Sequence, residues 1–317
     1  MPPRLPPASA RRSTVVGRIV AHDAFFWATV VVFTASGWWI ALSIERDLLF
    51  DEGYHMGIIR VFSEQWSPFV DQTPAQAWLG DLTRFGSYLY HYLMSLPLRV
   101  LQWGGASVDT QFFVLRALTV LLVSASLWWF RRTLRLCGLG RGASNLSVFL
   151  FAALPLTSFV AATINYDNLL LLLAAMFFAA TARILTADRV TALPLVGLVA
   201  LGCLASLAKF TFLPVFLVCL VGVCVVTLNR RRRSVALGPP PIATGRGDRP
   251  SRALAIAVIA VAVVAVVLFA ERYLVSLIAY NSPQPDCDAV HSEAFCRNYA
   301  PWVRNEQLDD AFPDRSA

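Results

Sequence analysis

The feature that most constrains this chain is a series of long apolar runs separated by shorter polar segments. Seven can be read in the 317 residues, at about 25–45, 112–130, 145–163, 166–185, 192–209, 211–229 and 253–272. Each can cross a hydrocarbon core about 30 Å thick, and each is continuous rather than alternating, which is typical of helices and not of barrel strands. Because only 15% of the residues are charged, a water-soluble chain is excluded. The sequence predicts an all-α polytopic membrane protein with about seven transmembrane helices.

The distribution of arginine predicts which ends of these helices face the cytoplasm. The clusters are Arg4 to Arg18, Arg131 to Arg141, Arg183 with Arg189, and Arg230 to Arg252. Cytoplasmic loops carry such an excess, so all four clusters are assigned to that side. The prediction is a basic cytoplasmic tail over 1–24, a cytoplasmic linker over 230–252 and an extracytoplasmic C-terminus, in a bacterial plasma membrane. This bias accounts for the net charge of +7, so no nucleic-acid partner is expected.

Two of the six cysteines agree with this orientation. Cys287 and Cys296 fall in the polar tail 281–317, on the outward side, where an oxidising compartment favours a disulfide that closes a small loop. The other four cysteines lie in a cytoplasmic loop or in apolar runs, where a thiol usually acts as a small hydrophobe. No pair has the spacing of a zinc site. We therefore predict a Cys287–Cys296 disulfide and no metal ligands.

The outward segment 46–111 is too long for a simple connection between two membrane spans. Long segments of this kind are usually functional. It is rich in aromatic residues and poor in charge; the aromatic residues are Trp66, Phe69, Trp78, Phe85, Tyr88, Tyr90 and Tyr92. That composition is typical of helices lying in a membrane interface. We expect a long first extracytoplasmic loop that contains interfacial helices.

Acidic residues occur where the chain leaves two of the apolar runs. Asp51 and Glu52 follow the first run, with His55 one helical turn after Asp51. A carboxylate there could take a proton from an incoming hydroxyl, although capping a helix is the more common role at such a position. Asp167 opens the fourth run and is either an N-terminal cap or an interfacial functional acid. Lys209 ends the fifth run and is either a snorkelling lysine or a ligand-binding cation.

The predicted topology brings these residues to one outer interface. Arg60, Arg84 and His91 of the first loop lie on the same side. Carboxylates beside lysine and arginine at a lipid boundary suit one chemistry: the cations hold a lipid-linked phosphate, and a carboxylate activates an acceptor.

With these motifs in this order, the chain resembles the GT-C class of integral-membrane glycosyltransferases, including the protein O-mannosyltransferase and lipid A aminoarabinose transferase type. The resemblance covers about residues 25–280. The motifs are Asp51-Glu52-Gly53-Tyr54-His55, Arg84-Phe85-Gly86-Ser87-Tyr88-Leu89-Tyr90-His91, Val114-Leu115-Arg116, Asn165-Tyr166-Asp167 and Leu204-Ala205-Ser206-Leu207-Ala208-Lys209. Mycobacterial cell-wall arabinosyltransferases are more loosely similar, since their first outer loop also begins with an acidic pair followed by Gly-Tyr.

The resemblance implies a polyprenyl-phosphate-linked sugar as donor, an extracytoplasmic acceptor and transfer with inversion. It implies Asp51 as the catalytic base, with Glu52 as its neighbour or substitute. Arg84 and Lys209 would hold the donor phosphate, with Arg60 as a further candidate. Asp167, His55, Tyr88 and His91 would line or orient the cavity. No nucleotide site is expected, and the residues leave open whether a divalent cation assists.

One departure from the class leaves an alternative open. The class typically adds further spans, and sometimes a soluble domain, after a shared seven-helix module. A chain ending in the tail 281–317 would then be truncated, or would need a partner subunit supplying that part. A non-catalytic carrier, flippase or assembly partner with the same fold is the alternative function. An ion-coupled transporter ranks last, since the runs are nearly free of charge at mid-depth.

Overall fold

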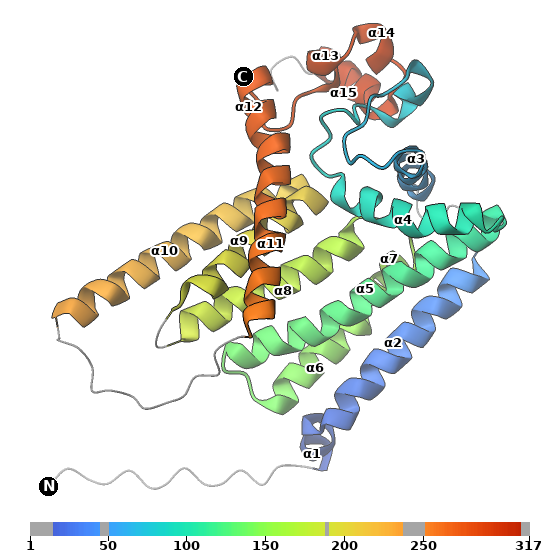
Figure 1. The fold of residues 1–317 in the computed structure, drawn as a ribbon. Helices are drawn as coiled ribbons and strands as arrows, with labels where there is room; N and C mark the ends of the chain where they lie inside the picture. Colours follow the sequence, from blue (N-terminus) through green and yellow to red (C-terminus); the bar gives the residue numbers. More distant parts are fainter. Residues whose placement is uncertain (1–14, 45–50, 188–189, 237–250, 312–317) are drawn as a thin grey trace, which may run out of the picture.

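The chain folds into helices arranged as a bundle with a cap at one end. The computed structural model describes residues 15–44, 51–187, 190–236 and 251–311 (Figure 1). Within these ranges every regular element is a helix. In chain order the elements are α1 (Val15–Ala21), α2 (Asp23–Ser43), α3 (Glu52–Ser63), η1 (Pro74–Leu79), α4 (Leu89–Trp103), α5 (Val108–Leu136), α6 (Arg141–Ala152), α7 (Pro155–Ala161), α8 (Asp167–Thr186), α9 (Ala192–Ala208), η2 (Phe210–Phe212), α10 (Leu213–Ala236), α11 (Arg252–Phe269), η3 (Ala270–Leu274), α12 (Val275–Tyr280), α13 (Cys287–Val290), α14 (Glu293–Cys296) and α15 (Ala300–Ala311).

Several of these helices are long and apolar enough to cross a membrane. Among the described residues there are 5 such helices, or 6 if the bent pair α6 and α7 forms a single span. They are Asp23–Ser43, Val108–Leu136, Asp167–Thr186, Phe210–Arg230 and Arg252–Tyr280. Helix α9 is also apolar, but with 17 residues it is shorter than these. The architecture agrees with an all-α polytopic membrane protein, and the count of seven spans stays a prediction.

The run expected to form one helix over 145–163 is broken. Helices α6 and α7 are bent by 68° relative to each other. Leu154, between them, has extended backbone angles, and Pro155 begins α7. Proline lacks an N–H and disfavours a helical residue before it, so the continuous hydrogen-bond ladder stops there. Composition predicted the apolar segment, and a single proline divides it into two helices.

Two further boundaries differ from the sequence expectation. Helix α10 continues to Ala236, so the first part of the predicted linker 230–252 is helical, and residues 237–250 of it lie outside the described residues. The last apolar run continues beyond 272, through the π-helical turn η3 and into α12. Of the predicted tail 1–24, residues 1–14 lie outside the described residues, and α1 follows them.

The bundle is organised around α5 and α8, which pack along each other. Helix α2 covers one side of α5, whereas α9 packs on α8 and in turn contacts α10 and α11 (Figure 1). Helices α9 and α10 approach very closely at Gly202, because a Cβ atom there would lie 2.1 Å from the Phe216 ring. Buried aromatic and aliphatic residues of α3 and α4, including Phe62 and Leu98, continue this core out of the bundle.

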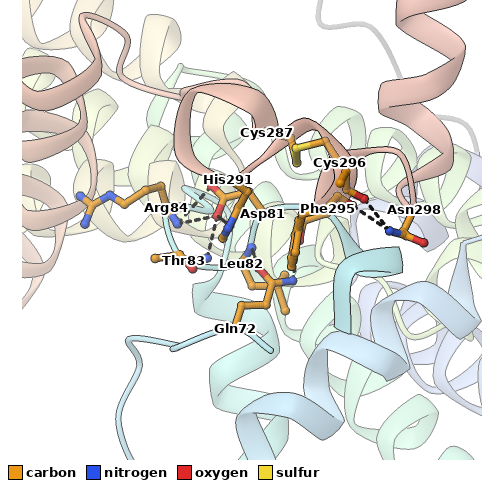
Figure 2. The surroundings of a disulfide bond; sticks show 12 residues. Gln72, Asp81, Leu82, Thr83, Arg84, Cys287, His291, Phe295, Cys296 and Asn298 are labelled. Carbon is orange, nitrogen blue, oxygen red and sulfur yellow. Dashed lines mark hydrogen bonds and ion pairs between the residues drawn. A yellow bond between two sulfur atoms is a disulfide. The ribbon is translucent and has the colours of Figure 1, made fainter. Parts of the chain in front are cut away.

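The segment 51–111 and the C-terminal tail form the cap at one end of the bundle. Helix α4 lies across the ends of the long helices, and α3 packs on α4 (Figure 1). Helix α14 of the tail packs on η1. The tail contains the disulfide between Cys287 and Cys296 (Figure 2). The end of the bundle opposite the cap carries α1.

Candidate functional site

An open cavity of about 950 Å³ lies where the cap meets the ends of α8 and α9. Its lining comes from segments far apart in sequence; the residues are Asp51, Gly53, Tyr54, His55, Trp78, Phe85, Ser87, Tyr166, Lys209, Phe210, Thr211, Gln284, Tyr299, Ala300 and Pro301. The wall thus combines a carboxylate, an ammonium group, an imidazole and several aromatic rings. A large, mostly apolar cavity with a few convergent polar groups is the usual form of a ligand site.

Asp51 lies at the mouth of this cavity, at the N-terminal end of α3. Its carboxylate is half-exposed, and its Oδ2 atom is 3.3 Å from His55 Nε2 and 3.3 Å from Asn165 Nδ2. The oxygen of the Asn165 amide accepts the backbone N–H of Asp167 at 2.8 Å. Asn165 therefore caps the first turn of α8 with one atom and holds Asp51 with the other. This arrangement ties the carboxylate to two elements while leaving it open to a ligand.

A chain of hydrogen bonds runs from Asp51 into the protein through two histidines. His55 Nδ1 is 2.9 Å from His91 Nε2, and His91 Nδ1 is 3.2 Å from the carbonyl oxygen of Ser87. His91 is fully buried, and burial holds its pKa well below the usual 6.5, so its ring is neutral.

The hydrogen-bond partners then determine where the protons lie. The Ser87 carbonyl only accepts, so His91 Nδ1 carries the single proton of that ring and His91 Nε2 accepts from His55. His55 Nδ1 is thus the proton-bearing nitrogen of the contact between the two rings. The pKa of Asp51 is lowered from its usual value, mainly by the hydrogen bond with His55, and the carboxyl group therefore stays ionised.

Lys209 supplies the positive charge of the cavity wall. It is the only lysine in the sequence, and it lies in an extended link between α9 and η2. Its Nζ atom donates to Asp167 Oδ1 at 2.7 Å and lies 4.6 Å from the centre of the Tyr166 ring. Because an ammonium group has three donors, it can hold Asp167 and still bind an anion. This contact ties the Lys209 ammonium group to the first turn of α8.

Ser87 links the lysine to the cap. Its hydroxyl accepts the backbone N–H of Phe210, the residue after Lys209, at 2.9 Å. Its carbonyl oxygen is the end of the histidine chain. One residue of the motif at 84–91 therefore positions both the lysine backbone and His91.

Glu52, expected beside Asp51 as a second catalytic carboxylate, lies in a different environment. It is fully buried and does not line the cavity. Arg116 donates to it from Nε at 2.8 Å and from Nη2 at 2.5 Å, and the backbone N–H of Ile164 donates at 3.0 Å. Arg116 also donates to the backbone oxygen of Ile44 after α2. This ion pair joins α2, α3, α5 and the turn before α8, and it fixes the backbone that carries Asp51.

The other cations and Tyr88 are also outside the cavity lining. The Arg84 guanidinium donates to Glu271 Oε1 at 2.9 Å, to the Glu271 backbone oxygen at 2.7 Å and to Ser276, so it ties the cap to the end of the last long helix. Arg60 is exposed and lines a separate, smaller hollow. Tyr88 is fully buried, which raises its pKa to about 12. The predicted topology and the family resemblance grouped these residues with Lys209, but tertiary packing separates them.

Residues of the cavity wall that sequence reasoning did not select are mainly aromatic. Tyr54, Trp78 and Phe85 belong to the first loop, whose aromatic residues predicted helices in the membrane interface and not a ligand site. Tyr299 and Pro301 come from the tail, and no motif there indicates a ligand site. Their contribution depends on the tail folding back over η1, which a sequence pattern of short polar helices does not encode.

The described residues contain no group of three His, Cys, Asp or Glu side chains placed to hold a metal ion. The carboxylate of Asp51 has His55 beside it, but the other ring nitrogen of His55 and both nitrogens of His91 are engaged in the hydrogen-bond chain. This donor set does not fit a divalent cation.

Comparison with protein-family models, with curated proteins and with solved structures found no match to this chain.

Proposed function

We propose that the protein is an integral-membrane glycosyltransferase that transfers a sugar from a polyprenyl-phosphate donor to an extracytoplasmic acceptor. The observation that carries the proposal is that the ionised carboxylate of Asp51 and the ammonium group of Lys209 share one cavity wall at the end of an apolar bundle. An anion-binding group and a base are the two functions that such a transfer requires. The GT-C-like order of motifs is the second support.

The proposed topology has seven spans, with the N-terminus in the cytoplasm and the C-terminus outside. Seven spans require α9 and the bent pair α6–α7 to cross as well. Helix α9 has 17 residues, which is at the short end of the lengths that span a bilayer. Arg131, Arg132, Arg135 and Arg141 gather in one hollow with Asp23, at the end of the bundle away from the cavity. Such clustering favours that end as the cytoplasmic one and supports an extracytoplasmic cavity.

In the proposed reaction Asp51 accepts the proton of an acceptor hydroxyl as its oxygen attacks the anomeric carbon. The bond from that carbon to the phosphate oxygen breaks, and its electron pair leaves with polyprenyl phosphate. Displacement by a single attack inverts the anomeric configuration. Lys209 would stabilise the charge that develops on the leaving phosphate, since an ammonium group acts there as a point charge.

The geometry favours a narrower set of reacting residues than the motifs did. Lys209 is the donor-phosphate ligand in this proposal, whereas Arg84 keeps the cap on the last long helix. Glu52 supports the position of Asp51 through Arg116 and takes no proton. His55 and His91 orient Asp51 and hold it ionised.

The experiment that tests the donor site uses the single lysine. Purified protein in lipid nanodiscs is treated with an amine-reactive reagent, with and without polyprenyl phosphate, and modification of the Lys209 peptide is measured by mass spectrometry. Polyprenyl phosphate is expected to protect Lys209, and a neutral polyprenol is not. Lys209→Ala should lose saturable binding, and Lys209→Arg should retain part of it. A lysine modified at the same rate with and without the lipid would contradict the proposal.

The base is tested by release of polyprenyl phosphate from a sugar-bearing donor. Asp51→Asn should lower the rate by a factor of about 10² to 10⁴, which is the usual contribution of a general base. Asp71→Asn is the matched control, since Asp71 is an exposed aspartate of the same loop outside the cavity. A carrier or flippase is the alternative function. It would bind the donor equally well and would tolerate Asp51→Asn.

A further inference from the structure

The C-terminal tail is closed by two contacts within itself, and a third contact joins it to the first loop. The Cys287–Cys296 disulfide joins α13 to α14 (Figure 2). Between them, His291 Nε2 lies 2.9 Å from Asp81 Oδ1 of the first loop. The His291 ring also stacks on Phe295, with ring centres 4.2 Å apart. The tail segment 287–301 is therefore held as a unit against the loop.

Tyr299 is the point at which this segment enters the cavity wall. Its ring packs on Gly80, where a Cβ atom would lie 2.9 Å from the ring carbons. Gly80 also has a φ of +75°, which side-chain-bearing residues rarely adopt, so both the conformation and the close approach require glycine. The Tyr299 ring also stacks with the Tyr54 ring, and the two ring centres are 6.3 Å apart. The Tyr54 hydroxyl donates to the Leu79 carbonyl at 3.0 Å, which fixes this second ring.

Tyr299, Tyr54 and Trp78 line the same cavity as Asp51 and make part of its wall aromatic. The polyprenyl chain of a donor needs no such wall, because the bilayer already provides an apolar environment. A sugar ring differs, since it presents C–H groups with partial positive charge on one face and hydroxyls at its edge. The face of an aromatic ring is negative and attracts such groups.

We propose that Tyr299, together with Tyr54, forms the subsite for the sugar ring of the donor, and that the disulfide-closed tail positions it. This inference rests on the proposed function and adds the part of the donor that the tail recognises.

The test compares polyprenyl-phosphate lipids with and without a sugar. Binding of polyprenyl-phosphate-linked hexoses and pentoses, and of bare polyprenyl phosphate, is measured on the full chain in nanodiscs. Wild type should bind at least one sugar-bearing lipid more tightly than the bare lipid. Tyr299→Ala should lower that preference by about 3- to 10-fold, corresponding to the loss of one aromatic stacking contact. Tyr299→Phe keeps the ring and should keep the preference.

Two controls separate the subsite from general damage to the fold. Tyr280→Ala makes the same truncation at a tyrosine outside the cavity lining, and it should leave the preference unchanged. A reducing agent should lower the preference in wild type, whereas in Cys287→Ser with Cys296→Ser it should be low already and insensitive to reduction.

The outcomes distinguish this inference from the proposed function. Equal binding of sugar-bearing and bare lipid by wild type would leave the phosphate site intact and overturn the sugar subsite. Retention of the preference in Tyr299→Ala would do the same. Binding of neither lipid, with Lys209 unprotected, would overturn the proposed function and this inference with it.

Discussion

Glu52→Gln tests whether Glu52 has a structural role while Asp51 is the carboxylate that reacts. Glu52 is fully buried, and Arg116 is 3% exposed, so neither charge is screened by solvent. The glutamate accepts from Arg116 Nε, Arg116 Nη2 and the Ile164 N–H. Glutamine keeps the volume and one acceptor, but its amide NH₂ meets an arginine donor and the guanidinium charge is left without its counter-ion.

The cost follows from this geometry. Removing one partner of a buried ion pair costs about 3–5 kcal/mol, because the remaining charge stays desolvated. At about 2 °C per kcal/mol for a chain of this size, the Tm should fall by about 6–10 °C. The assay is thermal unfolding in detergent or nanodiscs, followed by tryptophan fluorescence.

Three variants make the result interpretable. Glu64→Gln, the same change at an exposed glutamate, should stay within about 0.5 kcal/mol of wild type. Replacing both partners, as Glu52→Leu with Arg116→Met, should recover much of the loss, since no unpaired charge remains. Asp51→Asn should lower turnover with little change in Tm, because Asp51 is half-exposed. An unchanged Tm in Glu52→Gln would refute the structural role assigned to this residue.

Two further predictions concern stability. Burial lowers the pKa of His91 in the folded state, so the unfolded chain takes up the proton first as the pH falls below about 6.5, and stability should drop by at most about 1.4 kcal/mol per pH unit. Unfolding midpoints measured between pH 5 and 8 should depend less on pH in His91→Gln than in wild type. An identical pH dependence in the two proteins would contradict a neutral, buried His91 ring. Gly202→Ala places a Cβ 2.1 Å from Phe216 and should cost about 1–3 kcal/mol, whereas Gly222→Ala, with open space around it, should be neutral or slightly stabilising. Equal unfolding midpoints for the two alanine variants would show that α9 and α10 do not pack this closely.

The apolar runs are the part of the fold that could be predicted from the sequence. A continuous apolar run of sufficient length can cross the bilayer, and as a helix it satisfies its own backbone hydrogen bonds there. Asp51 and Lys209 could also be selected, since charged residues stand out at the ends of such runs. The break at Leu154 and Pro155 and the continuation of α10 to Ala236 were missed, because boundaries depend on individual residues and on packing.

The sequence by itself determined the class of protein, the positions of the apolar segments and the charged residues from which a site could be built. Only the tertiary structure decided which of those residues meet. Asp51 and Glu52 are adjacent in sequence, yet one faces the cavity and the other is buried against Arg116, because neighbouring residues at the start of a helix point in different directions. Arg84 and Lys209 look equivalent as cations, and each is paired with a carboxylate, Arg84 with Glu271 and Lys209 with Asp167, but only Lys209 lines the cavity. Tyr299 is distant in sequence from every motif and reaches the wall through tertiary contacts: the disulfide closes the tail on itself, and His291 joins it to Asp81 of the loop.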